Sequence, residues 1–252
     1  MQTDRDLYRK AAQEILHEYE SLVIRQESVL EILTEGDKAI GCSVNSGSVY
    51  FAEAVVLTAG TFLAGKIHIG DSQTPGGRVG EPASSKLAES MRGMPFRVGR
   101  LKTGTPPRLK SESINFEVLE KQHSDELAPP MSARSRKEVR PSQISCFITH
   151  TNINTHKIIQ DNILRSAMYS GAIEGVGPRY CPSIEDKISR FAERDYHQIF
   201  LEPEGLESDL VYPNGISTSL PVEVQKQFVQ SIRGLSLIHI SEPTRQEAIS
   251  YA

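Results

Sequence analysis

Residues 29–61, VLEILTEGDKAIGCSVNSGSVYFAEAVVLTAGT, carry the strongest fold signal in the chain. Apolar and β-branched residues gather there in short runs, which predict strands. The strands are expected at 29–33, 39–44 and 49–52. The intervening EGDK and NSGS segments hold the residues typical of tight turns. Strands joined by such short turns pair with their neighbours, so the segment predicts an antiparallel meander.

The meander leads into an apolar run, Ala54 to Leu57, which predicts a buried strand. The small-residue turn Thr58-Ala59-Gly60-Thr61 ends that strand. Such a turn allows backbone to approach a cofactor, although a simple tight turn has the same composition. A meander of this kind is typical of the Rossmann-type flavin domains of the glutathione-reductase class, and this favours Thr58 and Gly60 as flavin contacts.

The flanking sequence predicts a mixed α/β chain in two units. Helices are expected at 4–20, 84–91, 154–170 and 183–194, and further strands at 21–25, 96–98, 145–151 and 198–201. Loops are expected at 70–82, 103–107 and 112–141. The fold class is therefore a partial Rossmann-type FAD-binding domain with a β-meander over 1–94, followed by an inserted α/β domain over 95–234.

Composition limits the functional class. The 252 residues suffice for one large or two ordinary domains, and no apolar run approaches the roughly 18 residues of a membrane span. Cys42, Cys146 and Cys181 are too scattered for a disulfide framework, and no metal-ligand spacing occurs, so no metal is expected. The net charge of -4 gives no global argument for nucleic acid, but basic residues cluster at 97–110 and 134–140.

The run GPRYCPSIEDK at 177–187 places a thiol between prolines and charges. Arg179 and Lys187 flank Cys181 and would lower a thiol pKa, which favours a reactive cysteine. A structural cysteine among surface charges is the alternative. Glu185 and Asp186 have the chemistry of acid–base groups, yet carboxylates near a helix start are more often partners of the helix dipole.

Six motifs in this order resemble one family, the FAD-dependent enzymes that modify the wobble uridine of tRNA at carbon 5 (the MnmG or GidA family). The motifs are LTAGTFLAGKIHIG (57–70), GGRVGEP (76–82), GRLKTGTPPR (99–108), GPRYCPSIEDK (177–187), QIFLEPEG (198–205) and YPNGISTSLP (212–221). The resemblance implies addition of a carboxymethylaminomethyl or aminomethyl group at uridine 34. It implies FAD, NADH as reductant, methylenetetrahydrofolate as one-carbon donor, a GTPase partner (MnmE) that joins a homodimer in a heterotetramer, and a cytoplasmic location.

The resemblance also assigns residues. FAD contacts fall on Val29 and Ser84, and Cys181 is the catalytic residue, either adding to carbon 6 of uridine or moving the carbon 5 proton. The nicotinamide-dinucleotide segment falls on Gly177, Pro178, Arg179, Tyr180, Cys181, Pro182, Ser183, Ile184, Glu185, Asp186, Lys187, Ile188, Ser189, Arg190 and Phe191. Contacts to tRNA are expected at Arg100, Lys102, Arg108, Arg179 and Lys187. A generic flavin-dependent oxidoreductase of a small metabolite and a non-enzymatic tRNA-binding module remain as alternatives.

Both ends of the chain depart from the family. No G-x-G-x-x-G occurs, although family members hold the FAD pyrophosphate with that turn. Residues 235–252 begin LSLIHISEPTR and resemble a translated sequencing adapter, so native sequence is expected to end near Gly234. The chain is therefore interpreted as an internal fragment that is inactive alone.

Overall fold

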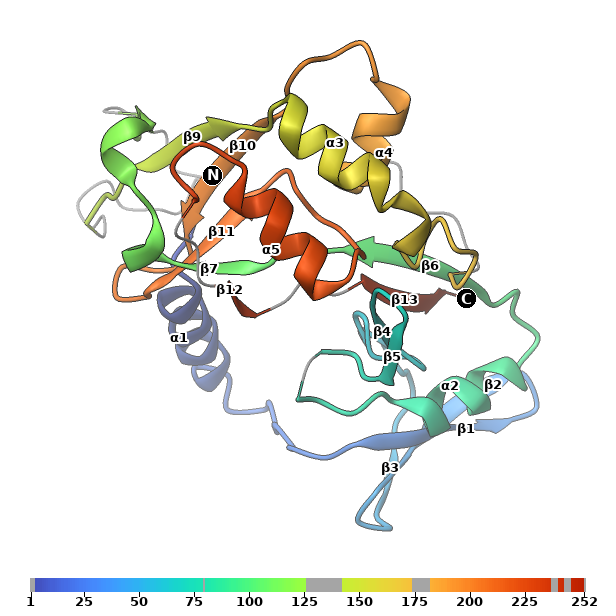
Figure 1. Cartoon of the computed structure of the whole chain (residues 1–252). Helices are drawn as coiled ribbons and strands as arrows, with labels where there is room; N and C mark the ends of the chain where they lie inside the picture. The colour runs from blue at the N-terminus through green and yellow to red at the C-terminus, as the bar shows by residue number, and fades with distance from the viewer. Residues whose placement is uncertain are drawn as a thin grey trace.

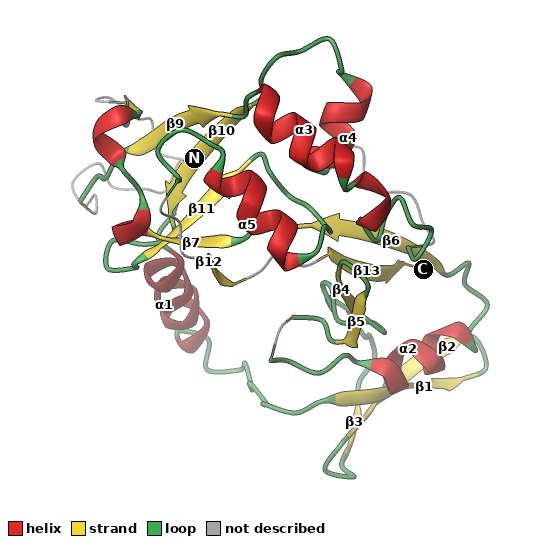
Figure 2. Ribbon diagram, viewed as in Figure 1, coloured by secondary structure: helices red, strands yellow, loops and turns green. Residues whose placement is uncertain are grey.

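The computed structural model describes residues 3–78, 80–125, 142–173, 182–236, 240–242 and 246–251. Figure 1 shows the arrangement of its elements, and Figure 2 distinguishes helices, strands and loops. The helices are α1 Arg5–His17, α2 Ser85–Arg92, α3 Ile153–Asp161, α4 Ile184–Arg190 and α5 Val222–Gln230. The strands are β1 Val29–Glu35, β2 Lys38–Val44, β3 Val49–Phe51, β4 Lys66–Ile69, β5 Ser72–Pro75, β6 Gly99–Gly104, β7 Arg108–Lys110, β8 Glu120–Gln122, β9 Cys146–His150, β10 Gln198–Pro203, β11 Leu210–Asn214, β12 Ile240–Glu242 and β13 Gln246–Tyr251.

The predicted meander is confirmed. Strands β1, β2 and β3 form an antiparallel sheet in sequence order, with Ile32 opposite Cys42. Gly36 turns the chain between β1 and β2 at a φ of 58°, in the left-handed region that glycine adopts without steric cost. Helix α2 lies on this sheet in Figure 1 and closes a small core with Leu63, Leu87 and Met91.

The larger core lies under a six-stranded sheet of order β12-β7-β11-β10-β9-β8. Helices α3, α4 and α5 cover one face of this sheet (Figure 1). Ile159 of α3, Ile188 of α4 and Phe228 of α5 are all at most 1% exposed and belong to one cluster with sheet residues such as Leu201. Burial of these apolar side chains is the main favourable contribution to folding in this half of the chain.

A third sheet joins parts of the chain that are far apart in sequence. Its order is β5-β4-β13-β6, so β13 pairs with β4 on one side and with β6 on the other. All strand pairings within the described residues are antiparallel. The mixed α/β class is confirmed, whereas the division at residues 94 and 234 stays a prediction.

Three predicted strands are wrong. Residues 21–25 and 54–57 lie outside the sheets, and Val56 is 85% exposed. The expected strand at 96–98 begins instead at Gly99. The apolar residues in these segments favour strands, but a strand forms only where a neighbouring strand supplies backbone hydrogen-bond partners. Residues 54–57 have no such neighbour among the described residues.

The predicted helices are confirmed: α1, α3 and α4 are shorter than expected, and α2 has the expected length but begins one residue later. Helix α5 was missed. Asp4 caps α1 by accepting a hydrogen bond from the Leu7 amide at 2.7 Å. No side chain of α1 is buried within the described structure, although the sequence shows an apolar stripe there. In the part of the chain that the structure describes, every helix is too short or too polar to cross a bilayer.

Candidate functional site

The predicted dinucleotide segment is partly visible, as the start of α4. Ser183 caps this helix and forms a capping box with Asp186. The Ser183 hydroxyl oxygen accepts from the Asp186 amide at 3.2 Å, and the Asp186 carboxylate accepts from the Ser183 amide at 3.2 Å. Reciprocal bonds of this kind satisfy two backbone donors at a helix start. Residues 177–181, including the candidate catalytic Cys181, lie outside the described residues.

Asp186 also pairs with Lys102, one of the residues expected to contact tRNA. Their side chains approach at 3.4 Å, and each residue is at most 5% exposed. A charge this deeply buried requires a partner of opposite sign, which each side chain supplies to the other. Lys102 therefore ties β6 to the start of α4, and its ammonium group is not presented to solvent.

Glu185, the neighbour of Asp186, is fully buried and has no cation beside it among the described residues. Its Oε1 accepts hydrogen bonds from Ser166 Oγ at 3.0 Å and Thr218 Oγ1 at 2.9 Å, and from the Ser219 amide at 3.1 Å. Its Oε2 has no partner within the described structure. Burial raises the pKa of this carboxyl, and the hydrogen bonds to Oε1 oppose that rise without overcoming it.

Two adjacent carboxyls are therefore held in different environments. Asp186 has a cation and accepts from the Ser183 amide, the Ser183 hydroxyl and the Tyr169 hydroxyl, whereas Glu185 has only neutral donors and a buried oxygen without a partner among the described residues. Burial raises the pKa of Glu185, and a raised pKa suits a carboxyl to proton transfer. The sequence showed both residues but gave no sign of Ser166, Thr218 and Ser219, which reach Glu185 from distant segments.

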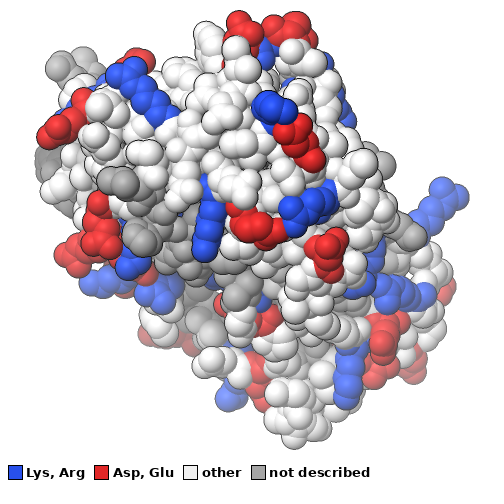
Figure 3. Space-filling view, viewed as in Figure 1, with Lys and Arg blue, Asp and Glu red and all other residues white. Residues whose placement is uncertain are grey.

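The other residues expected to contact tRNA are engaged within the chain. Arg100 donates to the Ala64 carbonyl at 3.2 Å, and Lys187 donates to the Gly215 carbonyl at 2.8 Å. Arg108 donates to Glu204 at 2.6 Å and stacks over the Tyr212 ring at 4.5 Å. Figure 3 shows basic and acidic side chains interspersed over the visible face, without a broad area of one sign. Arg179 lies outside the described residues.

Two of the four expected FAD positions border the small core beneath α2. Val29 packs against that cluster, and Ser84 caps α2, where its amide donates to the Phe62 carbonyl at 2.8 Å. The Ser84 side chain makes no capping hydrogen bond to the first turn of α2.

The other two expected FAD positions, Thr58 and Gly60, flank Ala59, which packs on the same cluster. Gly60 has a φ of 56° and no atom within 4 Å of the place where a Cβ would stand. The turn is thus left-handed and open on that side. Nearby, Gly77 of the GGRVGEP motif lies so close to Phe62 that an added Cβ would stand 2.3 Å from its ring.

Comparison with known proteins identifies the family. The family model described as "Glucose inhibited division protein A" matches residues 1–251. Two solved structures of Aquifex aeolicus GidA, in crystal forms I and II, are 43% and 39% identical to this chain, with TM-scores of 0.91 and 0.89. Each match covers 100% of this chain but only 43% and 40% of the Aquifex chains, so this chain spans less than half their length. On the family match and these identities, the chain belongs to the GidA family.

Proposed function

We propose that the chain is part of an FAD-dependent enzyme that modifies tRNA at the wobble uridine, adding a carboxymethylaminomethyl or aminomethyl group at carbon 5. The observation that carries the proposal is the family match over 1–251, together with 43% identity to Aquifex GidA over the whole chain. The resemblance of the sequence motifs to the family implies methylenetetrahydrofolate, NADH and a GTPase partner, MnmE, acting with a homodimer in the cytoplasm.

The residues around α2 fit an FAD contact. The Ser84 hydroxyl stands at the start of an eight-residue helix, where backbone amides favour an anionic or polar group. Val29 offers an apolar surface beside it, and the open left-handed turn at Gly60 lets a ligand approach the backbone. When bound, FAD supplies the redox chemistry, and the role of these residues is to hold and orient it.

Cys181 is the proposed catalytic residue. Carbon 5 of uridine is a weak nucleophile, and thiolate addition at carbon 6 would activate it; alternatively, the thiol moves the carbon 5 proton. In either role the cysteine needs a fixed backbone. The capping box of Ser183 and Asp186 begins two residues later and anchors that end of the segment.

The proposal is tested with Cys181→Ser introduced at the equivalent position of a full-length family enzyme. The expected result is loss of the modified uridine from its tRNA, measured by nucleoside mass spectrometry, with FAD content unchanged. Cys146→Ser is the matched control, because Cys146 is a half-buried thiol on β9, away from the α4 segment. Full modification by the Cys181 variant would remove this thiol from catalysis.

The two alternative functions predict different results for the same full-length enzyme. A flavin-dependent oxidoreductase of a small metabolite would bind FAD but would not shift tRNA in a gel. A non-enzymatic module would bind tRNA without a flavin absorbance band. The proposed function requires both signals together.

A further inference from the structure

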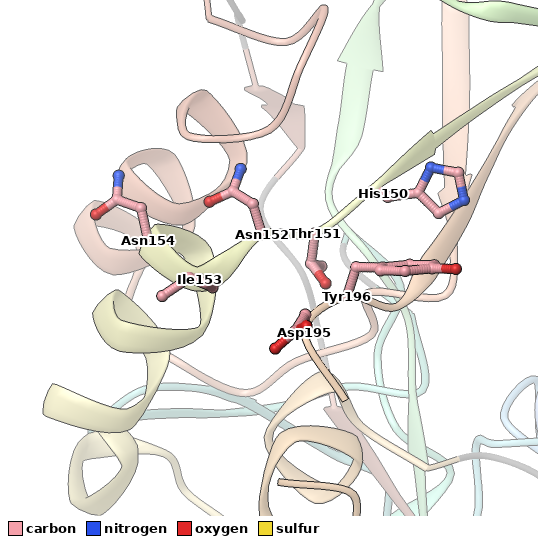
Figure 4. A pocket seen from close by; sticks show the side chains of 7 residues that line it. All are labelled: His150, Thr151, Asn152, Ile153, Asn154, Asp195 and Tyr196. Atoms are coloured by element: carbon pink, nitrogen blue, oxygen red, sulfur yellow. The ribbon is translucent and has the colours of Figure 1, made fainter. Parts of the chain in front are cut away.

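A surface pocket of about 580 Å³ lies where β9 ends and α3 begins, beside the loop that joins α4 to β10 (Figure 4). This volume falls within the range of small-ligand pockets. His150 and Ile153 line it from the β9–α3 connection, and Asp195 and Tyr196 line it from the facing loop. None of these residues belongs to the FAD or dinucleotide segments discussed above.

The pocket presents a fixed aromatic ring to solvent. Tyr196 is 60% exposed, and its ring meets that of His150 edge to face, with centroids 5.0 Å apart and planes at 88°. Ile153, which is 71% exposed, adds an apolar side chain from α3. A ring already held by an aromatic neighbour loses little conformational entropy when a flat ligand stacks on it.

Hydrogen-bonding groups surround this apolar surface. The amides of Ile153 and Asn154 open α3 and have no acceptor within the described structure, whereas the next two amides are satisfied by Asn152. The Asp195 carboxylate is exposed on the opposite side. The pocket therefore offers donors on one wall and an acceptor on the other, the combination needed along the edge of a nucleobase.

One exposed cation, Arg194, lies in the loop two residues before Tyr196, between the carboxylates of Glu193 and Asp195. The Arg194 guanidinium lies 5.4 Å from the ring centre of Phe191, which is 45% exposed. The loop thus carries one cation, Arg194, between two exposed aromatic rings, and the rings are placed for stacking on bases.

We infer that this pocket binds an unpaired base of single-stranded RNA, stacked on Tyr196. On the proposed function, that base belongs to a loop of the substrate tRNA, so the identity of the RNA rests on that proposal. The exposed carboxylate disfavours a phosphate inside the pocket and accepts an N–H group of a base instead. Base stacking on one ring selects for single-stranded RNA over duplex.

The test uses the 252-residue chain and an RNA hairpin that carries 2-aminopurine in its loop. Tyr196→Ala is expected to weaken binding by about 5- to 100-fold and to restore the quenched fluorescence of the loop base. Tyr196→Trp keeps a stacking ring and retains the affinity. Tyr19→Ala is the matched control, because Tyr19 is also 60% exposed but lies beyond the end of α1. Circular dichroism establishes that each variant is folded.

The outcomes separate this inference from the proposed function. If the Tyr196→Ala variant binds the hairpin as tightly as the unchanged chain, the proposal that the pocket binds a base is wrong. The proposed tRNA modification is not affected by that result. If the unchanged chain does not bind the hairpin, the proposal that the pocket binds a base is also wrong. The proposed function is tested separately by the modification assay on the full-length enzyme. Equal affinity for the hairpin and for a duplex of the same length contradicts base stacking.

Discussion

At the scale of single residues, Glu185 is a carboxyl that the fold buries completely. A carboxylate is costly to bury without a cation, so burial raises the pKa of Glu185. Because the folded pKa lies above the unfolded value, the contribution of Glu185 to stability is fully present below the unfolded pKa and is lost as pH rises through the folded pKa.

Glu185→Gln is therefore expected to fold as stably as the unchanged chain at pH 4, which lies below the unfolded pKa, and more stably at pH 8. The amide oxygen preserves the acceptor for Ser166, Thr218 and the Ser219 amide without a titrating proton. Glu185→Ala leaves these three donors without an acceptor and should lower the free energy of unfolding by about 3 kcal/mol. Urea denaturation at both pH values measures the difference. A Gln variant that loses as much stability as the Ala variant would show that Glu185 is ionised in the fold.

Lys102 provides a second prediction at this scale. Lys102→Met leaves the buried Asp186 carboxylate without its cation and is expected to reduce the free energy of unfolding by about 3–5 kcal/mol. The control is Lys110→Met, since Lys110 pairs with Glu112 at the surface, where an ion pair contributes about 1 kcal/mol or less. Similar losses for both variants would contradict a structural role for the Lys102 pair.

At the scale of elements, the start of α4 depends on its cap. Ser183→Ala removes the hydroxyl of a complete capping box and should cost about 1 kcal/mol. Ser84→Ala is the comparison, because Ser84 caps α2 without a side-chain hydrogen bond and should cost less than about 0.5 kcal/mol in the chain without FAD. Chemical denaturation measures the loss of unfolding free energy in both variants. Equal losses would show that the hydrogen bond of the Ser183 hydroxyl does not contribute to stability.

The elements also show what sequence patterns can predict. The meander at 29–52 was predictable because its pairing partners are adjacent and joined by short turns. Helix α5 was predictable but missed, since Pro221 precedes apolar residues at 224, 228 and 229. The partners of Glu185 were not predictable, because Ser166 and Ser219 meet it only after three segments have packed. The partial burial of Arg108 and the burial of Lys102 were likewise invisible in a basic motif.

At the scale of the whole molecule, buried histidines make stability depend on pH. Burial lowers the pKa of His68, His156 and His197, and for His197 the nearby His156, Lys187 and Arg194 lower it further. The unfolded chain therefore takes up protons first, so stability falls as pH drops from about 6.5 toward the folded values. His156→Gln is expected to flatten this fall, as measured by unfolding between pH 5 and 8. An unchanged slope of stability against pH would mean that other groups cause the fall. Glu185 acts in the opposite direction, because its protonation at low pH favours the folded state.

At the same scale, β13 joins strands that are far apart in the sequence. This strand lies between β4 and β6, and its six residues pair with the whole length of β6 from Gly99 to Gly104. Deleting 240–252 removes that strand and β12, and leaves β4 and β6 with an exposed edge each. The truncated chain is expected to unfold in two steps, because β4 and β6 are then no longer joined through β13. Hydrogen exchange at the β6 amides should accelerate, while the amides of β10, held between β9 and β11, stay protected. A single transition with unchanged exchange at β6 would show that residues 240–252 contribute nothing to the fold, as expected of a sequence that resembles an adapter.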